Sequence, residues 1–284
     1  MNAINHAFDT GFDALLWPLD QLGRPVALVL ASAVAGVLAL LLFKQVSFQK
    51  RIRAVKDRIQ AHLIEIRIYQ DDLRITARAI AKVLARNFQY LALNLVPFIP
   101  LSLPFAIVLA QLVVRYGFDP VPVTGEQAQP LPGTATLVRI ELERESASLA
   151  SSLRLELPPG VEARSPLVRL ASEGVAYQEV LVRAAGVHEL VVTLANGTRE
   201  TKQLAAGVHV RTSQPERAKG LVHALLWPAE DALAPGSPFA SISATLPDSR
   251  LGWLPGGPGG VVLVFLVASL VAGALAVKPL KVTI

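Results

Sequence analysis

Residues 44–86 read KQVSFQKRIRAVKDRIQAHLIEIRIYQDDLRITARAIAKVLAR and lie between two uncharged apolar runs, residues 25–43 and 88–114. The stretch holds eleven basic and four acidic residues, a net charge of +7, whereas the whole chain carries +5. Each apolar run is long enough to cross the roughly 30 Å hydrocarbon core of a bilayer, which takes about 20 apolar residues. A short basic loop beside apolar spans marks the cytoplasmic side of a membrane. We therefore expect residues 44–87 to form a cytoplasmic segment between two spans.

The composition is that of an integral membrane protein. Of the 284 residues, 52% are hydrophobic and 17% are charged, whereas a soluble domain carries about a quarter of charged residues. Basic proteins often bind nucleic acid, but the positive charge here lies beside the spans, where membrane orientation and anionic lipid explain it. The chain has no cysteine, which excludes disulfides, thiolate metal sites and cysteine nucleophiles. The bilayer is the expected partner, and no nucleic acid is expected.

The basic segment is predicted to be helical, because no glycine or proline occurs between residues 44 and 96 and these two residues are the strongest helix breakers. Apolar residues recur at alternating spacings of three and four, as in a coiled-coil seam. The residues of this seam are Ile52, Val55, Ile59, Ile66, Tyr69, Leu73, Ile80 and Val83.

If both flanking runs cross the membrane, the segment must reverse direction, and Gln70-Asp71-Asp72 is the best place because aspartate can cap a second helix. We predict a hairpin with arms at residues 45–69 and 72–88. The alternative is one unbroken rod, in which the second run does not cross. The expected contact for a cytoplasmic partner is the basic start of the hairpin, Lys50, Arg51, Arg53, Lys56 and Arg58.

The second apolar run, residues 88–115, contains Pro97, Pro100 and Pro104. Prolines remove backbone donors and kink or loosen a helix, and the freed groups need partners inside a bilayer. Two interpretations stay open: a kinked span satisfied within its own bundle, or a partly hydrated groove that accepts polar segments of another chain. The groove would be lined by Asn94, Ser102 and Gln111.

Residues 1–24 are expected to form an amphipathic helix, with Asp9, Asp13 and Asp20 away from its apolar face. Trp17 suits the outer membrane interface, although an ordinary packing helix fits the pattern equally well. The apolar face is formed by Phe8, Phe12, Leu15, Leu19 and Leu22.

A proline-rich linker at residues 116–133 precedes a region with a different period. Asn196-Gly197 is a hairpin-turn signal, which also explains the glycosylation sequon Asn196-Gly197-Thr198 without a sugar. Residues 134–211 therefore predict an extracytoplasmic β-sandwich of immunoglobulin-like type. Polar and apolar residues alternate, as in strands, at residues 136–142, 153–157, 180–183 and 189–194.

Residues 212–257 are predicted to return the chain to the membrane, and the apolar run at residues 258–277 to cross it. The tail at residues 278–284 carries two lysines, which suits the cytoplasm. The expected fold is a membrane protein of three transmembrane α-helices with a cytoplasmic helical hairpin and an extracytoplasmic immunoglobulin-like β-sandwich. We expect a bacterial inner membrane, with the N-terminus outside and the C-terminus in the cytoplasm.

The sequence carries no motif that requires an enzyme. It has no P-loop, HExxH or GxSxG pattern. His62 and Glu65 share a helix face, but two ligands without a third make a weak metal site. We therefore expect no catalytic residue, no cofactor and no metal.

The order of these segments resembles the Oxa1 superfamily, the group that includes the YidC insertases. Residues 25–115 carry the resemblance, especially Lys44-Gln45-Val46-Ser47-Phe48-Gln49-Lys50 through the hairpin, followed by the proline-bearing span. Bacterial membrane proteins with this hairpin and a periplasmic β-domain look similar. The resemblance implies a non-enzymatic, insertase-like or chaperone-like factor that helps apolar segments of nascent membrane proteins enter the membrane, with clients or ribosomes at the hairpin. The alternative is a scaffold or accessory subunit that binds a partner through its β-domain.

Overall fold

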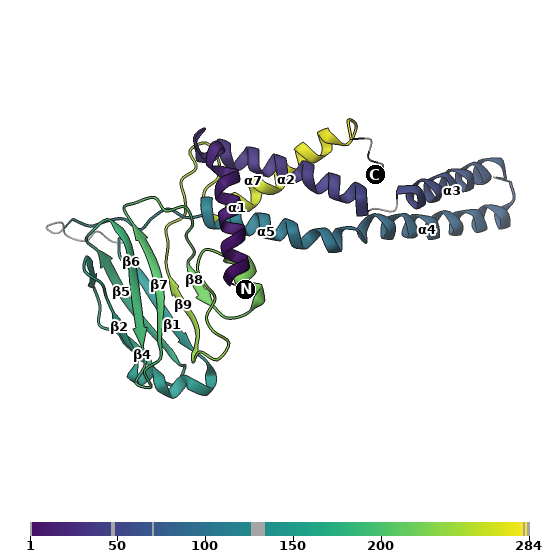
Figure 1. Ribbon diagram of the computed structural model, residues 1–284. Helices are drawn as coiled ribbons and strands as arrows, with labels where there is room; N and C mark the ends of the chain where they lie inside the picture. Colours follow the sequence, from purple (N-terminus) through teal and green to yellow (C-terminus); the bar gives the residue numbers. More distant parts are fainter. Residues whose placement is uncertain (1, 47–48, 70, 126–133, 281, 283–284) are drawn as a thin grey trace. The chain divides into compact units, whose positions relative to one another are not determined.

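The computed structural model describes residues 2–46, 49–69, 71–125, 134–280 and 282 (Figure 1). The chain forms two compact units. The first contains Met1–Leu28 and Leu109–Val264, and the second contains Val29–Val108 and Phe265–Ile284. Parts of the predicted linker and Gln70 of the predicted reversal lie outside the described residues.

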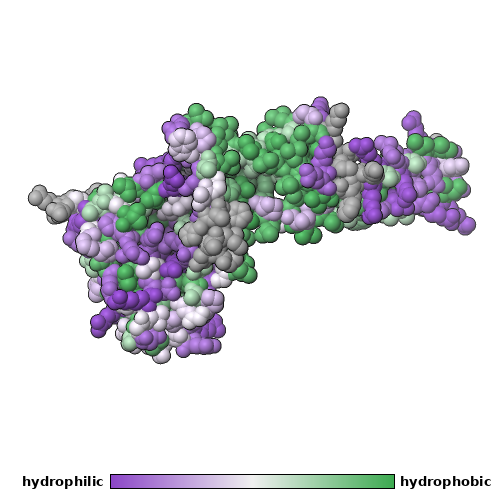
Figure 2. Space-filling view, in the orientation of Figure 1, coloured by the Kyte–Doolittle hydropathy of each residue, from purple (hydrophilic) through white to green (hydrophobic). Residues whose placement is uncertain are grey.

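Three helical stretches are long and apolar enough to cross a membrane: Arg24–Val46, Leu73–Tyr116 and Gly257–Ala276. The first is helix α2 and the last is α7 (Gly257–Ala276). Hydrophobic residues cover much of the surface of these helices in Figure 2, whereas the surface of the β-strand region is mostly hydrophilic. At this level the prediction of three apolar helices and a β region is confirmed.

The middle stretch begins earlier than the predicted span at residues 88–115, and it is broken at one of the prolines that were expected to kink it. Helix α4 (Leu73–Leu95) begins in the basic segment and continues into the apolar run, and α5 (Phe98–Tyr116) follows after a break at residues 96–97. Pro97 lies at the break, because proline has no N–H to donate to the preceding turn. Pro100 lies in the first turn of α5, where proline is tolerated, and Pro104 lies inside the helix.

Helix α3 (Gln49–Ile68) packs along α4, as Figure 1 shows. Asp72 caps α4, with its side chain accepting from the backbone N–H of Arg74 at 2.9 Å and of Ile75 at 3.1 Å. This capping confirms the role predicted for an aspartate at the reversal.

The predicted seam of this helix pair is only partly correct. Ile52 and Val55 are buried, but Tyr69, Leu73 and Ile80 are exposed. On α4 the small residue next to Ile80, Ala79, is buried instead. A pattern of large apolar residues fails here because a small side chain lets the backbones approach closely.

Helices α2 and α7 approach to backbone contact in the second unit. A β-carbon placed on Gly36 would lie 2.1 Å from the carbonyl oxygen of Ser269. Small residues permit such close approach between membrane helices, where dispersion forces replace the hydrophobic effect. Aromatic rings fill the space beside this contact, with Phe105 and Phe265 at 4.6 Å between ring centroids.

The β region consists of two sheets. One follows the order β3-β5-β1-β9-β8 with β4 paired to β5, and the other follows β2-β6-β7. Inward-facing residues of both sheets join one hydrophobic cluster, which includes Ile140, Val180, Val192 and Leu204. The immunoglobulin-like type of this two-sheet region stays a prediction. The strands are β1 (Thr136–Leu142), β2 (Arg154–Glu156), β3 (Val161–Ala163), β4 (Val168–Leu170), β5 (Val175–Val182), β6 (Gly186–Thr193), β7 (Arg199–Ala206), β8 (Glu216–Ala218) and β9 (Phe239–Ala244).

The predicted strand at residues 136–142 is confirmed as β1, and the Asn196-Gly197 turn is confirmed between β6 and β7. Gly197 has a φ of 82°, and the Asn196 side chain accepts from the N–H of Thr198 at 3.0 Å. Sequence patterning did not predict β3, β4 or β8, because each has only three residues and no full period of alternation. It also did not predict the 3-10 helix η1 (Arg144–Ser152) or the short helix α6 (Leu221–Leu226).

The close contact between α2 and α7 predicts that adding one methyl group at Gly36 will destabilise the protein. Gly36→Ala places its β-carbon against main-chain atoms that cannot rotate away, so we expect the unfolding free energy to fall by about 1–3 kcal/mol. Thermal melting of the purified chain in detergent micelles, followed by circular dichroism, measures the change. Gly273→Ala is the matched control, because a β-carbon there meets its nearest atom at an ordinary 3.5 Å. An equal loss in both variants would contradict this account of the contact.

Candidate functional site

The predicted groove residues do not form one site. Asn94 lies two residues before the break between α4 and α5, and its side-chain amide donates to the carbonyl oxygen of Tyr90 at 2.8 Å. Ser102 is exposed and donates to the carbonyl oxygen of Ile99 at 2.7 Å. Both bonds remain within the residue's own helix.

Gln111 is buried and points to a different partner. Its amide donates to the Asp9 carboxylate of helix α1 (Asn2–Asp20) at 2.7 Å. Nine residues separate Gln111 from Ser102 on α5, or about 13 Å along the helix axis. Gln111 is therefore part of a contact between α1 and α5.

A cluster of charged residues joins α1 to the end of α5. The side chain of Arg115 is only 6% exposed and forms an ion pair with Asp13, while Asp9 lies 3.9 Å away. Asp13 also accepts from Arg211 at 2.8 Å. Asp9 and Asp13 can reach α5 together because residues four apart share a helix face.

The same contact decides how α1 lies on the protein. Its acidic residues face α5 and Leu16 is buried, whereas Trp17 is 62% exposed and Leu15 is 61% exposed. The helix therefore packs on protein through its aspartates and Leu16, and leaves Leu15 and Trp17 outside. The packing role left open by the sequence is observed, and the interfacial role stays a prediction.

Asp119 connects the ends of three apolar helices. One carboxylate oxygen accepts from Arg24, at the start of α2, at 2.7 Å. The other accepts from the backbone N–H of Arg250 at 2.9 Å, shortly before α7 begins. Asp119 itself follows the end of α5, and its backbone N–H donates to Pro247 at 3.0 Å. The start of α2, the end of α5 and the approach to α7 thus meet at one carboxylate.

A pocket of about 210 Å³ lies within this polar cluster. Three arginines and two aspartates line its wall. Burial lowers the pKa of His209, which favours the neutral imidazole. Arg115 and Arg24 each retain a buried Nε without a partner in the described chain. Both terminal nitrogens of each guanidinium donate to carboxylate or carbonyl oxygens, which ties α1, α2 and the end of α5 together. The lining residues are Asp13, Trp17, Asp20, Arg24, Arg115, Tyr116, His209 and Arg211.

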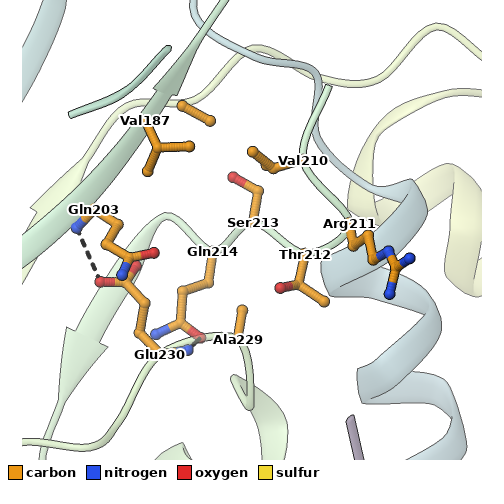
Figure 3. Close-up of a pocket in the computed structure, with 10 residues that line it drawn as sticks. Val187, Gln203, Val210, Arg211, Thr212, Ser213, Gln214, Ala229 and Glu230 are labelled. Atoms are coloured by element: carbon orange, nitrogen blue, oxygen red, sulfur yellow. Dashed lines mark hydrogen bonds between the residues drawn. The ribbon is translucent and has the colours of Figure 1, made fainter. Parts of the chain in front are cut away.

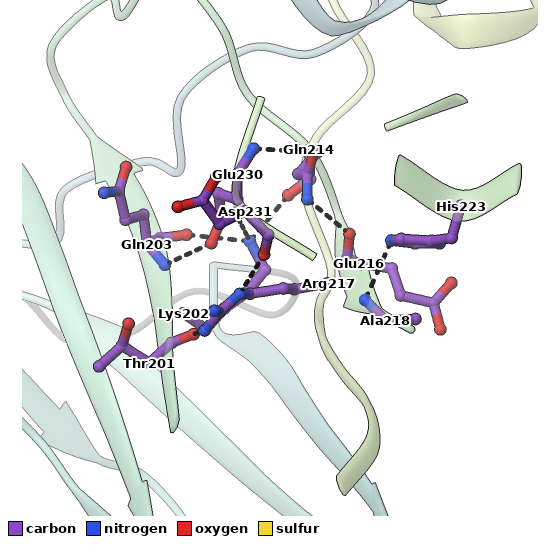
Figure 4. Close-up of polar contacts among 10 residues, drawn as sticks. All are labelled: Thr201, Lys202, Gln203, Gln214, Glu216, Arg217, Ala218, His223, Glu230 and Asp231. Atoms are coloured by element: carbon purple, nitrogen blue, oxygen red, sulfur yellow. Dashed lines mark hydrogen bonds and ion pairs between the residues drawn. The ribbon is translucent and has the colours of Figure 1, made fainter. Parts of the chain in front are cut away.

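The β region contains a second buried polar cluster, drawn in Figure 4. Lys202 of β7 has no exposed surface; its ammonium group forms an ion pair with Glu230 and donates to the carbonyl oxygen of Gln214 at 2.9 Å. The other oxygen of Glu230 accepts from the N–H of Gln203 at 3.1 Å. Burial lowers the pKa of Lys202, and the charge of Glu230 opposes that shift.

A small pocket of about 150 Å³ lies beside this cluster, with Gln203, Gln214 and Glu230 on its wall, as Figure 3 shows. The carboxylate of Glu230 is already held by Lys202 and by the backbone of Gln203. The cluster therefore fixes the segment that carries Gln214 and Glu230 against β7.

The expected cytoplasmic contact is exposed on α3 where the structure describes it. Arg51, Arg53, Lys56 and Arg58 are exposed around the buried Ile52 and Val55, while the side chain of Lys50 lies outside the described residues.

His62 and Glu65, the two residues considered as metal ligands, contact each other and Lys82. His62 and Glu65 lie 2.9 Å apart, and Lys82 approaches Glu65 at 3.8 Å. Within the described residues there is no group of three or more histidine, cysteine, aspartate or glutamate side chains placed to hold a metal ion.

Sequence reasoning missed the residues that make the strongest contacts. Lys202 shares the alternation of Leu204 and Ala206, so an inward-facing lysine on a strand was a signal for a buried partner. Arg115 directly follows an apolar run, and two aspartates four residues apart in α1 were available to it. No signal in the sequence identified Asp119 as a junction, because its partners are about 95 and 130 residues away.

Comparisons of the chain with protein-family models, with curated proteins and with solved structures found no match. The resemblance to the Oxa1 superfamily therefore stays a prediction.

The ion pairs of Asp13 predict a dependence of stability on pH. Burial acts to raise the pKa of Asp13, but hydrogen bonds from Arg211 and Arg115 outweigh it and hold the pKa below its ordinary value of 3.8. A carboxyl group whose pKa is lowered by folding stabilises the fold above the unfolded pKa, and that contribution is lost as the pH falls through the folded pKa. We expect Asp13→Asn to lower the unfolding free energy at pH 7 by about 1–3 kcal/mol.

The difference between Asp13→Asn and the parent chain should shrink when melting is measured at pH 3 instead of pH 7. Asp57→Asn, at an exposed position on α3, serves as the control and should leave melting unchanged at both values. A constant difference for Asp13→Asn across this range would show that its charge is not what stabilises the contact.

Removing the buried Lys202 should lower the unfolding free energy by more than Asp13→Asn does. Lys202→Met leaves the Glu230 carboxylate buried without its cation, which costs about 3–5 kcal/mol when one partner of a buried pair is removed. Loss of the β-sheet signal on heating measures this change. Lys202→Met combined with Glu230→Gln removes both charges and should recover part of the loss. If the double variant is less stable than the single one, the unpaired charge is not the cause.

Proposed function

We propose that this protein is a non-enzymatic, insertase-like factor of a bacterial inner membrane that helps apolar segments of other chains enter the bilayer. The three apolar helices span the membrane, and the basic pair α3–α4 lies in the cytoplasm, where nascent membrane proteins or a ribosome contact it. The β region lies on the opposite side and resembles an immunoglobulin-like sandwich.

Two contacts support this topology. Lys44, at the end of α2, donates to the carbonyl oxygen of Leu280, beyond the end of α7, at 2.7 Å. Asp119 joins the opposite ends of these helices to the end of α5. Helices α2 and α7 thus run in one direction and α5 in the other, as three spans require. The net charge of +7 in residues 44–86 favours the cytoplasm for the loop between the first two.

The observation that carries the proposal is the side chain of Asn94. Its carbonyl oxygen is buried and has no hydrogen-bond partner within the described residues. An unsatisfied buried acceptor costs about 1–3 kcal/mol, and inside lipid no bulk water relieves that cost. The acceptor lies beside the break at Pro97, where the backbone also lacks a donor. A water molecule or an N–H of an entering chain satisfies this acceptor, which lowers the barrier for a client's polar flank.

A photo-crosslinking amino acid at position 94, present while a membrane protein is synthesised, tests the proposal. We expect it to capture nascent chains. Position 111 is the matched control within the same stretch, because Gln111 is already bound to Asp9, and it should capture only the protein itself.

Capture of permanent neighbours alone at position 94, with no nascent chain, would remove the support for an insertase-like function. Affinity purification in mild detergent then distinguishes the scaffold alternative. One stoichiometric complex favours a scaffold or accessory subunit, whereas many substoichiometric clients favour insertion.

A further inference from the structure

The β region has an open, basic cleft that none of its structural clusters uses. The cleft has a volume of about 630 Å³, within the range of about 300–1,000 Å³ that ligand sites occupy. Three arginines and one glutamate line it, a net charge of +2. The charged residues are Arg154 and Glu156 of β2, Arg169 of β4 and Arg199 of β7.

The strand register places two of these arginines in one row across the sheet. Arg154 pairs with Thr193, and Thr193 pairs with Arg199. Neighbouring strands are about 4.8 Å apart, so the backbones of the two arginines are separated by about 10 Å. Both side chains are exposed, and both line the cleft.

Hydrogen-bond donors are in excess on this surface. The guanidinium of Arg154 has no hydrogen bond or ion pair with another described residue, and Arg199 has only a long contact of 3.9 Å with Glu156. The hydroxyl groups of Ser151 and Ser152 donate to carbonyl oxygens of their own turn, and that of Ser152 also accepts from the backbone N–H of Ala195 at 3.3 Å. A ligand for this cleft must therefore bring negatively charged acceptors.

We propose that the cleft binds an extended acidic peptide segment in which two acidic residues are separated by one other residue. In an extended chain, alternate side chains point the same way about 6.8 Å apart, which the flexible side chains of Arg154 and Arg199 span from a 10 Å base. Arginine binds carboxylates through two parallel hydrogen bonds. The described lining residues include no aromatic side chain to stack on a sugar ring, which disfavours an acidic polysaccharide.

Glu156 lies inside the row and competes for the same arginine. It contacts Arg199 at 3.9 Å and accepts from Thr193 at 3.4 Å. The entering carboxylate displaces Glu156 from Arg199. This site goes beyond the insertase-like function and does not depend on it, because every contact lies within the β region.

Fluorescence anisotropy with the full chain in detergent micelles tests the site. The probe is a labelled, end-blocked peptide Gly-Glu-Val-Glu-Gly, and the same peptide with glutamine in place of both glutamates is the reference. We expect Arg154→Gln with Arg199→Gln to weaken binding about tenfold, because two exposed ion pairs are lost. Glu156→Gln should strengthen binding about threefold by removing the competing carboxylate.

Arg164→Gln is the matched control, since Arg164 also has only a long ion pair, 3.8 Å from Glu179, and does not line the cleft. It should leave binding unchanged. Equal binding of the glutamine peptide, or equal weakening by Arg164→Gln, overturns the proposal. So does binding of polyphosphate or alginate that requires Arg154 and Arg199 while the acidic peptide does not bind.

Discussion

The carboxylate of Asp119 is the constraint on which the first unit depends. It follows the end of α5, pairs with Arg24 at the start of α2 and holds the backbone of Arg250 just before α7. A short bridge between Phe118 and Asp248 reinforces the same junction. Both oxygens of one carboxylate are therefore used, and they bring the start of α2 and the segment before α7 to the end of α5.

Two polar side chains in the same apolar helical stretch, Gln111 and Asn94, differ in how their hydrogen-bonding groups are satisfied. Gln111 reaches across to Asp9 and is satisfied by the protein, together with the neighbouring Arg115. Asn94 satisfies its donor within its own helix, but its acceptor is left buried and unpaired in the described chain. The contrast separates a residue whose amide is used on both sides, by Asp9 and Arg115, from one whose amide keeps an unpaired acceptor. It is also why the groove expected from three polar residues is reduced to one candidate position.

Hydropathy and periodicity predicted the elements that are determined locally. The apolar helices, the capping role of Asp72, strand β1 and the Asn196-Gly197 turn all depend on residues close together in the sequence. The contacts that organise the candidate site could not be predicted in this way. Arg115 pairs with Asp13, and Lys202 with Glu230, only after the chain has folded. The sequence shows that these residues are charged but not which residue each will pair with. The seam between α3 and α4 failed for a related reason, because Ala79 rather than Ile80 is buried.

The main-chain contact between Gly36 and Ser269 sets how this helix pair can move. Side chains that interlock can release one at a time by changing rotamer, but two backbones that touch have no such intermediate. Side-chain rotation alone therefore cannot open the contact between α2 and α7 at Gly36, because the main chains themselves must move apart.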